Sequence, residues 1–317
     1  MNLSDGLKQM RKYGGLRLAV EYCRLGLGRR IVKRVCWNIL HGKHIKNVYY
    51  ETNGMVAPIL LDKYDALIKE RVSHYSQQNL QQRRTGIVWF CWMQGKESMP
   101  DIIRACYNSQ VRNIKDRKFK FIDEGNWREY VDIPDYLVEK YRKGYMPVAM
   151  FTDLIRLELL IKYGGSWIDS TVLCTGGYNP EVLDADIFMY QYGRNKGLSN
   201  WFITSCTNNP ILMVIRDVLH QYWREYDVVL DYYIFHLLFG RLLSEYPEMI
   251  ARMPYADSYQ AIKLVYNWDK PFNDSVWEKF TGNVHFHKLT YKVKDCTRKD
   301  KSNCYNHILS EYLSLYE

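Results

Sequence analysis

The stretch from Phe151 to Leu173 constrains the fold of this chain more than any other, because it combines three local signals in a fixed order. Its first half is a near-continuous run of leucine and isoleucine, which predicts a buried helix. Gly164 and Gly165 follow and form a typical helix C-cap. The next residues predict a short strand in which Asp169 and Thr171 point to the same face, since side chains alternate along a strand. We therefore expect polar groups from two neighbouring elements to converge on one ligand.

A charged pair lies on a largely apolar sector of the predicted helix. Asp153 and Arg156 are three residues apart and share a face, whereas Glu158 and Lys162 mark the solvated side. A helix needs only one polar side to meet water, so a second pair indicates that the helix lines a cavity. The alternative is a buried ion pair that serves only the fold.

Five short stretches resemble one protein family in letters, order and spacing. They are IVWFCWMQGKESMP (Ile87–Pro100), CYNSQ (Cys106–Gln110), FTDLIRLELLIKYGGSWIDSTVL (Phe151–Leu173), DYYIFHLL (Asp231–Leu238) and HKLTYK (His287–Lys292). Together they resemble the capsular polysaccharide synthesis proteins, which belong to a larger group of glycosyltransferases with a DXD-type sugar-binding motif. This resemblance implies a GT-A fold, an α/β nucleotide-sugar-binding domain with a mixed central sheet.

The resemblance also assigns donor-binding roles. In relatives, an Asp and an Arg of the helix before the motif hold the donor sugar, and these positions are Asp153 and Arg156 here. The first Asp of the DXD motif contacts the ribose, the donor sugar or a metal, and it is Asp169 here. Gly165 and Thr171 complete the donor-binding set around this motif. The last motif position is Asp in relatives but Thr171 in this chain, so a cation there would lose a full negative charge of support.

A turn after the first predicted strand suits a nucleotide. The β-branched and aromatic run from Ile87 to Trp92 predicts a strand, and Gln94 and Gly95 turn the chain at its end. Loops at the carboxyl ends of such strands bind nucleotides in α/β sheets. We therefore place Trp92, Gln94 and Gly95 near the base or ribose. The alternative for Trp92 is burial behind the sheet.

Later residues complete the expected site. Asp231 is a catalytic candidate near the anomeric carbon, or else a helix N-cap. By resemblance to GT-A enzymes that use a late histidine, His287 joins Asp169 as an expected metal ligand; a satisfied or surface histidine is the alternative. Lys288 and Lys292 suit a diphosphate as point charges, and Lys292 is assigned to donor binding. A divalent cofactor, Mn²⁺ or Mg²⁺, is thus an expectation that the altered DXD motif weakens.

The N-terminal region is the most basic part of a chain whose net charge is +9. Arg24–Lys46 contains no acidic residue and interleaves basic with apolar residues, as an amphipathic helix on an anionic membrane does. The alternative is a helix packed on the catalytic domain with its basic side in water. No zinc-finger spacing or RNA-binding aromatic motif accompanies the charge, so we do not expect nucleic acid as a partner. A polar linker over residues 77–84 separates an expected basic helical segment, residues 1–84, from a GT-A-like domain, residues 85–317.

Three further features bear on location. The chain has no run of 18 apolar residues, and its first residues, MNLSDGLKQMRKYGG, lack the apolar core of a signal peptide. Its cysteines are scattered without a CxxC pair and read as reduced thiols. We expect a cytoplasmic protein held on the inner face of the cell membrane.

The expected function is transfer of a sugar from a nucleotide diphosphate sugar, a UDP-sugar, to a growing capsular or other surface glycan on a lipid carrier. The resemblance implies retention of configuration, and Asp153, Asp169 and Asp231 are the catalytic candidates. One alternative is an inactive family member that binds or assembles capsule components. Another is a protein whose main function is membrane or nucleic-acid binding through its basic N-terminus. The remaining expected elements are helices over 100–110, 136–143, 148–163, 209–225 and 231–244, and strands over 118–122, 167–174, 187–190 and 201–205.

Overall fold

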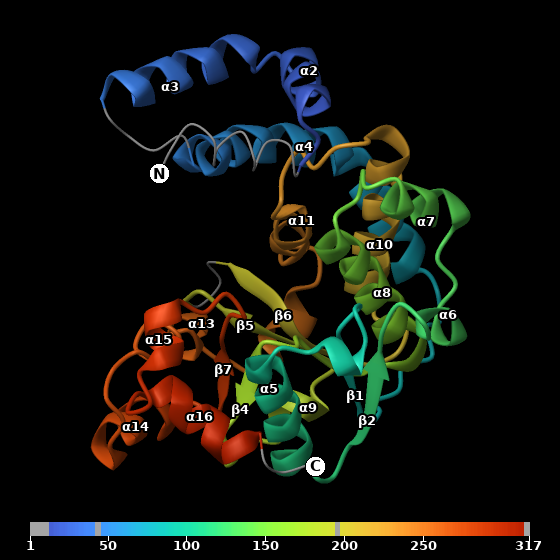
Figure 1. Cartoon of the computed structure of the whole chain (residues 1–317). Coiled ribbons are helices and arrows are strands. Elements are labelled where there is room, and N and C mark those ends of the chain that lie inside the picture. Colours follow the sequence, from blue (N-terminus) through green and yellow to red (C-terminus); the bar gives the residue numbers. More distant parts are fainter. Residues whose placement is uncertain (1–12, 42–45, 194–196, 314–317) are drawn as a thin grey trace. The chain divides into compact units, whose positions relative to one another are not determined.

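The computed structural model describes residues 13–41, 46–193 and 197–313 (Figure 1). Contacts divide the chain into two compact units, and each unit draws on three stretches that are far apart in sequence. The first unit comprises Met1–Leu80, Asp132–Glu158 and Pro210–Tyr246. The second comprises Gln81–Val131, Leu159–Asn209 and Pro247–Glu317.

A five-stranded mixed sheet forms the centre of the second unit. Its strands, in spatial order, are β2 (Lys118–Ile122), β1 (Ile87–Cys91), β3 (Gly165–Ile168), β6 (Leu198–Ser205) and β5 (Ile187–Gln191). The first three strands are parallel to one another, whereas β6 runs antiparallel to both β3 and β5. The α/β class with a mixed central sheet is therefore confirmed, and the strands predicted near residues 87, 118, 187 and 201 all belong to this sheet.

The predicted strand over residues 167–174 is wrong as one continuous element. The chain leaves the central sheet after β3, turns at Asp169–Thr171 and enters β4 (Val172–Cys174), which pairs antiparallel with β7 (Phe286–Lys288). The Asp169 carbonyl accepts the Val172 N–H at 3.0 Å and closes the turn. Asp169 and Thr171 therefore do not share a strand face, because they lie in the turn between two sheets.

The double glycine after helix α8 (Val148–Tyr163) has a steric cause. Gly165 has φ +89°, and a Cβ there would lie 2.3 Å from the Ile87 carbonyl oxygen of the neighbouring strand. Only glycine lets β3 approach β1 this closely. Gly164, with φ +65°, ends the helix, and its N–H donates to the Leu160 carbonyl at 2.9 Å.

Polar side chains of helix α5 (Asp101–Asn113) hold strand β4 by its backbone. Gln110 donates to the Val172 carbonyl at 2.7 Å, and Asn113 donates to the Cys174 carbonyl at 2.7 Å. The Ser109 hydroxyl accepts the Cys174 N–H at 3.0 Å. Two buried polar residues of the stretch CYNSQ, Ser109 and Gln110, thus have a structural reason: they satisfy backbone groups of the strand that follows the Asp169 turn.

The C-terminal helices cover α5. Helix α16 (Cys304–Tyr312) lies beside it (Figure 1), and the two share a buried apolar cluster with Trp268. Asn108 of α5 also donates to the Tyr312 carbonyl at 2.8 Å. The shorter elements of this unit are η1 (Lys96–Ser98), α6 (Trp127–Tyr130), α9 (Glu181–Asp184), α12 (Pro247–Ala251), α13 (Ser258–Ala261), α14 (Asp274–Thr281) and α15 (Asp295–Lys299).

The first unit is helical. It comprises α2 (Leu16–Arg24), α3 (Gly28–Leu40), α4 (Lys46–Ser76), α7 (Asp135–Arg142), most of α8, α10 (Pro210–Glu225) and α11 (Ile234–Leu242). The helices expected over 136–143, 148–163 and 209–225 are therefore present, and the one expected over 231–244 is shorter. The basic stretch expected as one helix from Arg24 to Lys46 is instead divided between α2, α3 and the start of α4. Residues 1–12 and 42–45 of the expected N-terminal segment lie outside the described residues.

Helix α4 packs against α10 through paired polar groups on their shared side. Tyr64 donates to Glu225 at 3.0 Å, and Tyr75 donates to Asp217 at 2.7 Å. The expected boundary near residue 84 lies close to the passage from the first unit into the second. The first 80 residues nevertheless share their unit with two later stretches. Local composition does not reveal such pairing, because the partners of α4 are about 150 residues away in sequence.

Candidate functional site

Trp92 and Asp169 lie at one edge of the central sheet, whereas Gly165, also assigned to donor binding, begins β3 and so lies at the opposite, amino end of the parallel strands. Because β2, β1 and β3 are parallel, their carboxyl ends lie at the same edge, where α/β sheets bind ligands. Trp92 follows β1, and Asp169 follows the neighbouring strand β3. Asp123 follows β2, but its carboxylate accepts the N–H groups of Gly125 and Asn126 and so stabilises a turn.

Asp169 is held in place by two side chains. Its Oδ1 accepts the Trp167 indole N–H at 2.8 Å, and its Oδ2 lies 2.6 Å from the Lys288 ammonium. The same ammonium donates to the Thr171 hydroxyl at 2.7 Å. Asp169 and Lys288 are 23% and 25% exposed, so a ligand can reach the pair. The sequence indicated Lys288 as a point charge but gave no sign that it binds Asp169 and Thr171.

The backbone of the Asp169 turn is fixed from three directions. The Asp169 N–H donates to the Trp201 carbonyl of β6 at 2.9 Å, and the Leu289 N–H donates to the Thr171 carbonyl at 2.8 Å. Gln110 of α5 reaches the carbonyl of Val172, directly after the turn. A turn tied to a sheet, a loop and a helix holds its side chains in one geometry, which is the condition for a preorganised binding site.

His287 lies away from Asp169. In β7, Lys288 pairs with Val172 and His287 pairs with Leu173, and neighbouring residues of a strand point to opposite faces. The His287 ring is fully buried, with Nε2 3.3 Å from the Thr175 hydroxyl. Burial, helped by the nearby His285, lowers the pKa of His287 to about 3, so the ring is neutral at pH 7.

The arrangement does not fit the expected metal site. Lys288, a cation, stands against Asp169 where His287 was expected as a second ligand. Within the described ranges, no group of three or more His, Cys, Asp and Glu side chains is placed to hold a metal ion. The assignment of a divalent cofactor to Asp169 and His287 stays a prediction that this geometry does not favour.

The turn after β1 lies beside the loop after β7. The rings of Trp92 and Tyr291 meet edge to face at a centroid distance of 5.7 Å, and the Trp92 indole N–H donates to Ser98 at 3.1 Å. Trp92 is half-buried, and Gln94 is exposed. Gly95 has φ +87°, which favours glycine. The loop after Lys288 thus connects the Asp169 turn with the predicted nucleotide turn, and Lys292 is an exposed residue of that loop.

Asp153 and Arg156 form the expected ion pair on α8, in the first unit. The Arg156 guanidinium lies 2.8 Å from Asp153 Oδ1, and the two side chains are only 5% and 12% exposed. A pair this buried fits both alternatives drawn from the sequence, a sugar-binding pair and a structural one. The role of the pair in donor binding stays a prediction.

Asp231 is buried just before helix α11. Its Oδ1 accepts the Tyr233 N–H at 2.7 Å, and Tyr233 is the N-cap residue of the helix. Asp231 therefore closes the turn that precedes the helix, close to the N-cap role weighed for it. Burial raises the pKa of Asp231 to about 6, against the opposing effect of the Tyr233 N–H. A catalytic role stays a prediction.

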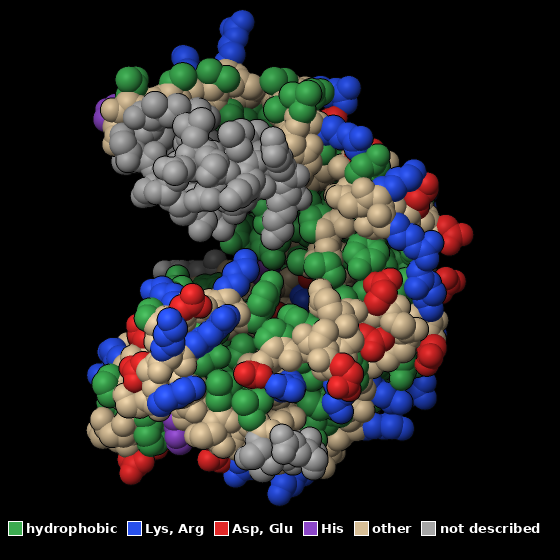
Figure 2. Space-filling view, in the orientation of Figure 1, with side chains coloured by type: hydrophobic (Ala, Val, Ile, Leu, Met, Phe, Trp, Pro, Cys, Tyr) green, Lys and Arg blue, Asp and Glu red, His purple; other side chains and the backbone are tan. Residues whose placement is uncertain are grey.

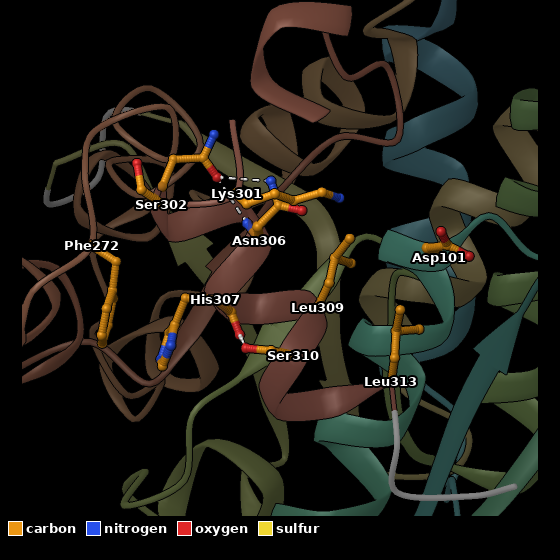
Figure 3. A pocket seen from close by; sticks show the side chains of 10 residues that line it. Asp101, Phe272, Lys301, Ser302, Asn306, His307, Leu309, Ser310 and Leu313 are labelled. Atoms are coloured by element: carbon orange, nitrogen blue, oxygen red, sulfur yellow. Dashed lines mark hydrogen bonds between the residues drawn. The ribbon is translucent and has the colours of Figure 1, made fainter. Parts of the chain in front are cut away.

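An open pocket lies along α16 in the second unit. It has a volume of about 760 Å³, and Figure 3 shows Phe272, Lys301, His307 and Leu309 among the residues that line it. A neighbouring pocket of about 380 Å³ is lined by Tyr291 together with Arg298 and Tyr305. Neither pocket is lined by a residue predicted from the sequence, although the second adjoins the loop that carries Lys292.

Comparison with known families identifies the chain. The sequence profile of the capsular polysaccharide synthesis proteins matches residues 36–308. The chain belongs to the capsular polysaccharide synthesis protein family. The matched region includes the sheet edge, the Asp169 turn and β7, so the resemblance noted from the five short stretches is confirmed.

Comparison with individual curated proteins gives no match. Among solved structures, the chain is similar to the PaToxG glycosyltransferase, with 14% identity and a TM-score of 0.38 over 81% of this chain and 98% of the other. Of the helices described here, none has the length and apolar character needed to cross a membrane.

Proposed function

We propose that this protein transfers a sugar from a nucleotide diphosphate sugar, a UDP-sugar, to a growing capsular or other surface polysaccharide. The observation that carries the proposal is the cluster of Asp169, Thr171 and Lys288 at the carboxyl edge of the parallel strands, next to the Trp92 turn. This edge is where α/β sheets bind nucleotides. Family membership supports the same reaction class.

Sugar transfer requires protein groups of opposite charge at the two ends of the donor. Sugar transfer releases a diphosphate with negative charge and passes through a transition state with positive charge on the sugar ring. Lys288 and Lys292 suit the diphosphate, and Asp169 suits the sugar or ribose hydroxyls. Asp153 and Arg156 are the proposed donor-sugar pair of the first unit. Retention is proposed from family resemblance, and attack on the same face as the leaving group needs no protein nucleophile.

We also propose that the acceptor is lipid-linked and that the protein binds the anionic inner face of the cell membrane. Helix α2 exposes Leu16 and Val20, and α3 exposes Val32, Trp37 and Leu40. Exposed basic residues of the same helices are Arg17, Arg24, Arg29, Arg30 and Lys33. Figure 2 shows hydrophobic and basic side chains next to one another along the top edge, where these helices lie. Mixed faces of this kind suit the headgroup layer of a membrane.

A nucleotide panel tests the proposal. The melting temperature of the full chain is measured with UDP, GDP, CMP and several UDP-sugars at millimolar concentration, each with and without Mn²⁺. A ligand that binds only the native state raises the melting temperature by mass action, so UDP should produce a shift. If no nucleotide produces a shift under either condition, the proposal is rejected.

An inactive family member that only binds or assembles capsule components is the second candidate. The observation that favours it is Thr171 at the position where the DXD motif has its last Asp. Donor hydrolysis separates the two, because a transferase slowly passes the sugar to water when no acceptor is present. Nucleotide binding without any release of free sugar would favour the second candidate.

A further inference from the structure

We infer that the Lys288 ammonium takes the place of the divalent cation in this site, so that the protein binds a nucleoside diphosphate without a metal ion. The inference rests on the proposed function and concerns the same sheet edge. It arises from a disagreement between the expected metal ligands and the residues that the fold brings to Asp169.

The Lys288 ammonium bridges two residues of the altered DXD motif, as a bound cation would. It lies 2.6 Å from Asp169 Oδ2 and 2.7 Å from Thr171 Oγ1, the first and third positions of the altered DXD motif. In a motif with two carboxylates, those two positions would face a metal ion. Here β7 carries a lysine into the space between them, because Lys288 pairs in register with Val172, the residue after Thr171.

The charges balance in the same way as in a metal site. Two carboxylates and a divalent ion sum to zero, and so do one carboxylate, one ammonium and a neutral hydroxyl. The change from Asp to Thr171 removes one negative charge, and the use of Lys288 in place of a divalent ion removes one positive charge. A divalent ion bound to Asp169 would be repelled by the Lys288 ammonium at close range. The single negative charge of Asp169 would then have to balance three positive charges.

The ammonium keeps a donor for a ligand. A lysine has three N–H donors, and its hydrogen bonds to the described residues are those to Asp169 and Thr171. The third donor is available to a diphosphate oxygen, and the side chain is 25% exposed. Since Trp167 holds the other oxygen of Asp169, the carboxylate fixes the ammonium at one place at the sheet edge. A fixed cation can bind the diphosphate in the ground state and as it leaves.

The first test is nucleotide binding with and without metal. Titration calorimetry of the full chain is carried out with UDP in the presence of EDTA and again with Mn²⁺. We expect dissociation constants that agree within about threefold. Binding that requires Mn²⁺ would overturn the inference and leave the proposed function intact. Absence of binding to any nucleotide of the panel under both conditions would overturn both.

The second test uses Lys288→Met, which keeps the unbranched stem of the side chain and removes the ammonium and its charge. Because the variant removes a charged hydrogen-bond donor to the diphosphate, UDP affinity in EDTA should fall by about tenfold to hundredfold. Lys299→Ala, which removes an exposed lysine of α15, is the matched control and should bind as the wild type does. Unchanged affinity of a folded Lys288→Met protein contradicts the inference.

The third test restores the carboxylate. The double variant Thr171→Asp with Lys288→Ala carries two carboxylates and no ammonium, so UDP binding should now depend on Mn²⁺. The wild type and the double variant are compared by titration with Mn²⁺ alone as well as with UDP. If the double variant gains no Mn²⁺ affinity over the wild type, Lys288 does not occupy a cation position, and the inference is wrong.

Discussion

Asp169 is the residue on which most of the site depends, since it binds Lys288 and Trp167 and belongs to the turn between β3 and β4. Asp169→Ala should reduce donor hydrolysis or sugar transfer by about 10²–10³, as loss of one charged transition-state contact does. The rate is measured on the folded variant with saturating donor. Asp227→Ala, which removes an exposed partner of Lys140, is the control and should leave the rate unchanged. Near-wild-type turnover by Asp169→Ala would show that the site is misplaced.

Substitution of Asp153 distinguishes a donor-binding role of this residue from a structural one. Asp153→Ala should abolish transfer, and it should also lower the free energy of unfolding by about 3–5 kcal/mol, because it takes away a buried carboxylate from Arg156. Urea denaturation measures the second effect. Asp101→Ala is a matched control, since Asp101 and Arg104 form an exposed pair with the same spacing, worth at most about 1 kcal/mol. A variant that is destabilised but keeps its specific activity would leave Asp153 with a structural role alone.

Asp231 should make stability depend on pH. Its folded-state pKa of about 6 lies about two units above the pKa of an unfolded aspartate, so the folded state binds the proton more tightly. The contribution of Asp231 to stability is therefore fully present below about pH 4 and is lost as pH rises through 6, by about 3 kcal/mol in total.

Asp231→Asn tests this pH dependence, because the amide stays neutral and still offers an oxygen to the Tyr233 N–H. The free energy of unfolding is measured for both proteins from pH 4 to 7.5. The difference between them should grow in favour of the variant as pH rises. A difference that is the same at every pH would contradict the assigned pKa.

At the scale of the element, Gly165 determines whether β3 can pair with β1. Gly165→Ala would place a Cβ against the Ile87 carbonyl at a positive φ, so the free energy of unfolding should fall by at least about 2 kcal/mol. Gly54→Ala is the control, because Gly54 is an exposed residue inside α4 with no atom near the added Cβ. This control should gain up to about 1 kcal/mol. Equal stability of the two variants would show that β3 can move away from β1.

At the scale of the whole molecule, the exposed faces of α2 and α3 should decide membrane binding. The protein should float with vesicles of phosphatidylglycerol and be released from them by high salt, since each basic residue near the surface contributes about 1 kcal/mol. Replacement of Arg29, Arg30 and Lys33 by Gln together with Leu40→Ser should abolish flotation. UDP binding should survive, because these residues are exposed.

Tyr266→Ser is the control for lost apolar surface, since Tyr266 is 75% exposed but lies in the second unit. It should float as the wild type does. If the variant of α3 floats equally well, then these helices are not the membrane-binding surface.

The sequence by itself determined the type and approximate bounds of several elements between residues 87 and 225. Periodic apolar runs placed β1, β2 and helices α5, α7, α8 and α10 correctly, because burial of one face leaves a local pattern. The double glycine after α8 was also visible in the sequence. The family resemblance singled out Asp153, Arg156 and Asp169 as a group, although nothing in the structure tests their assigned roles.

Only the tertiary structure decided which residues meet. The pairing of β4 with β7, about 115 residues apart in sequence, brings Lys288 rather than His287 to Asp169. The direction of each side chain there depends on a strand register that no local pattern encodes. The division into two units likewise depends on contacts between distant stretches, such as that of Tyr75 with Asp217. Periodicity records burial along the chain, whereas a site is formed by long-range pairing, so the chemistry around Asp169 became visible only in the folded protein.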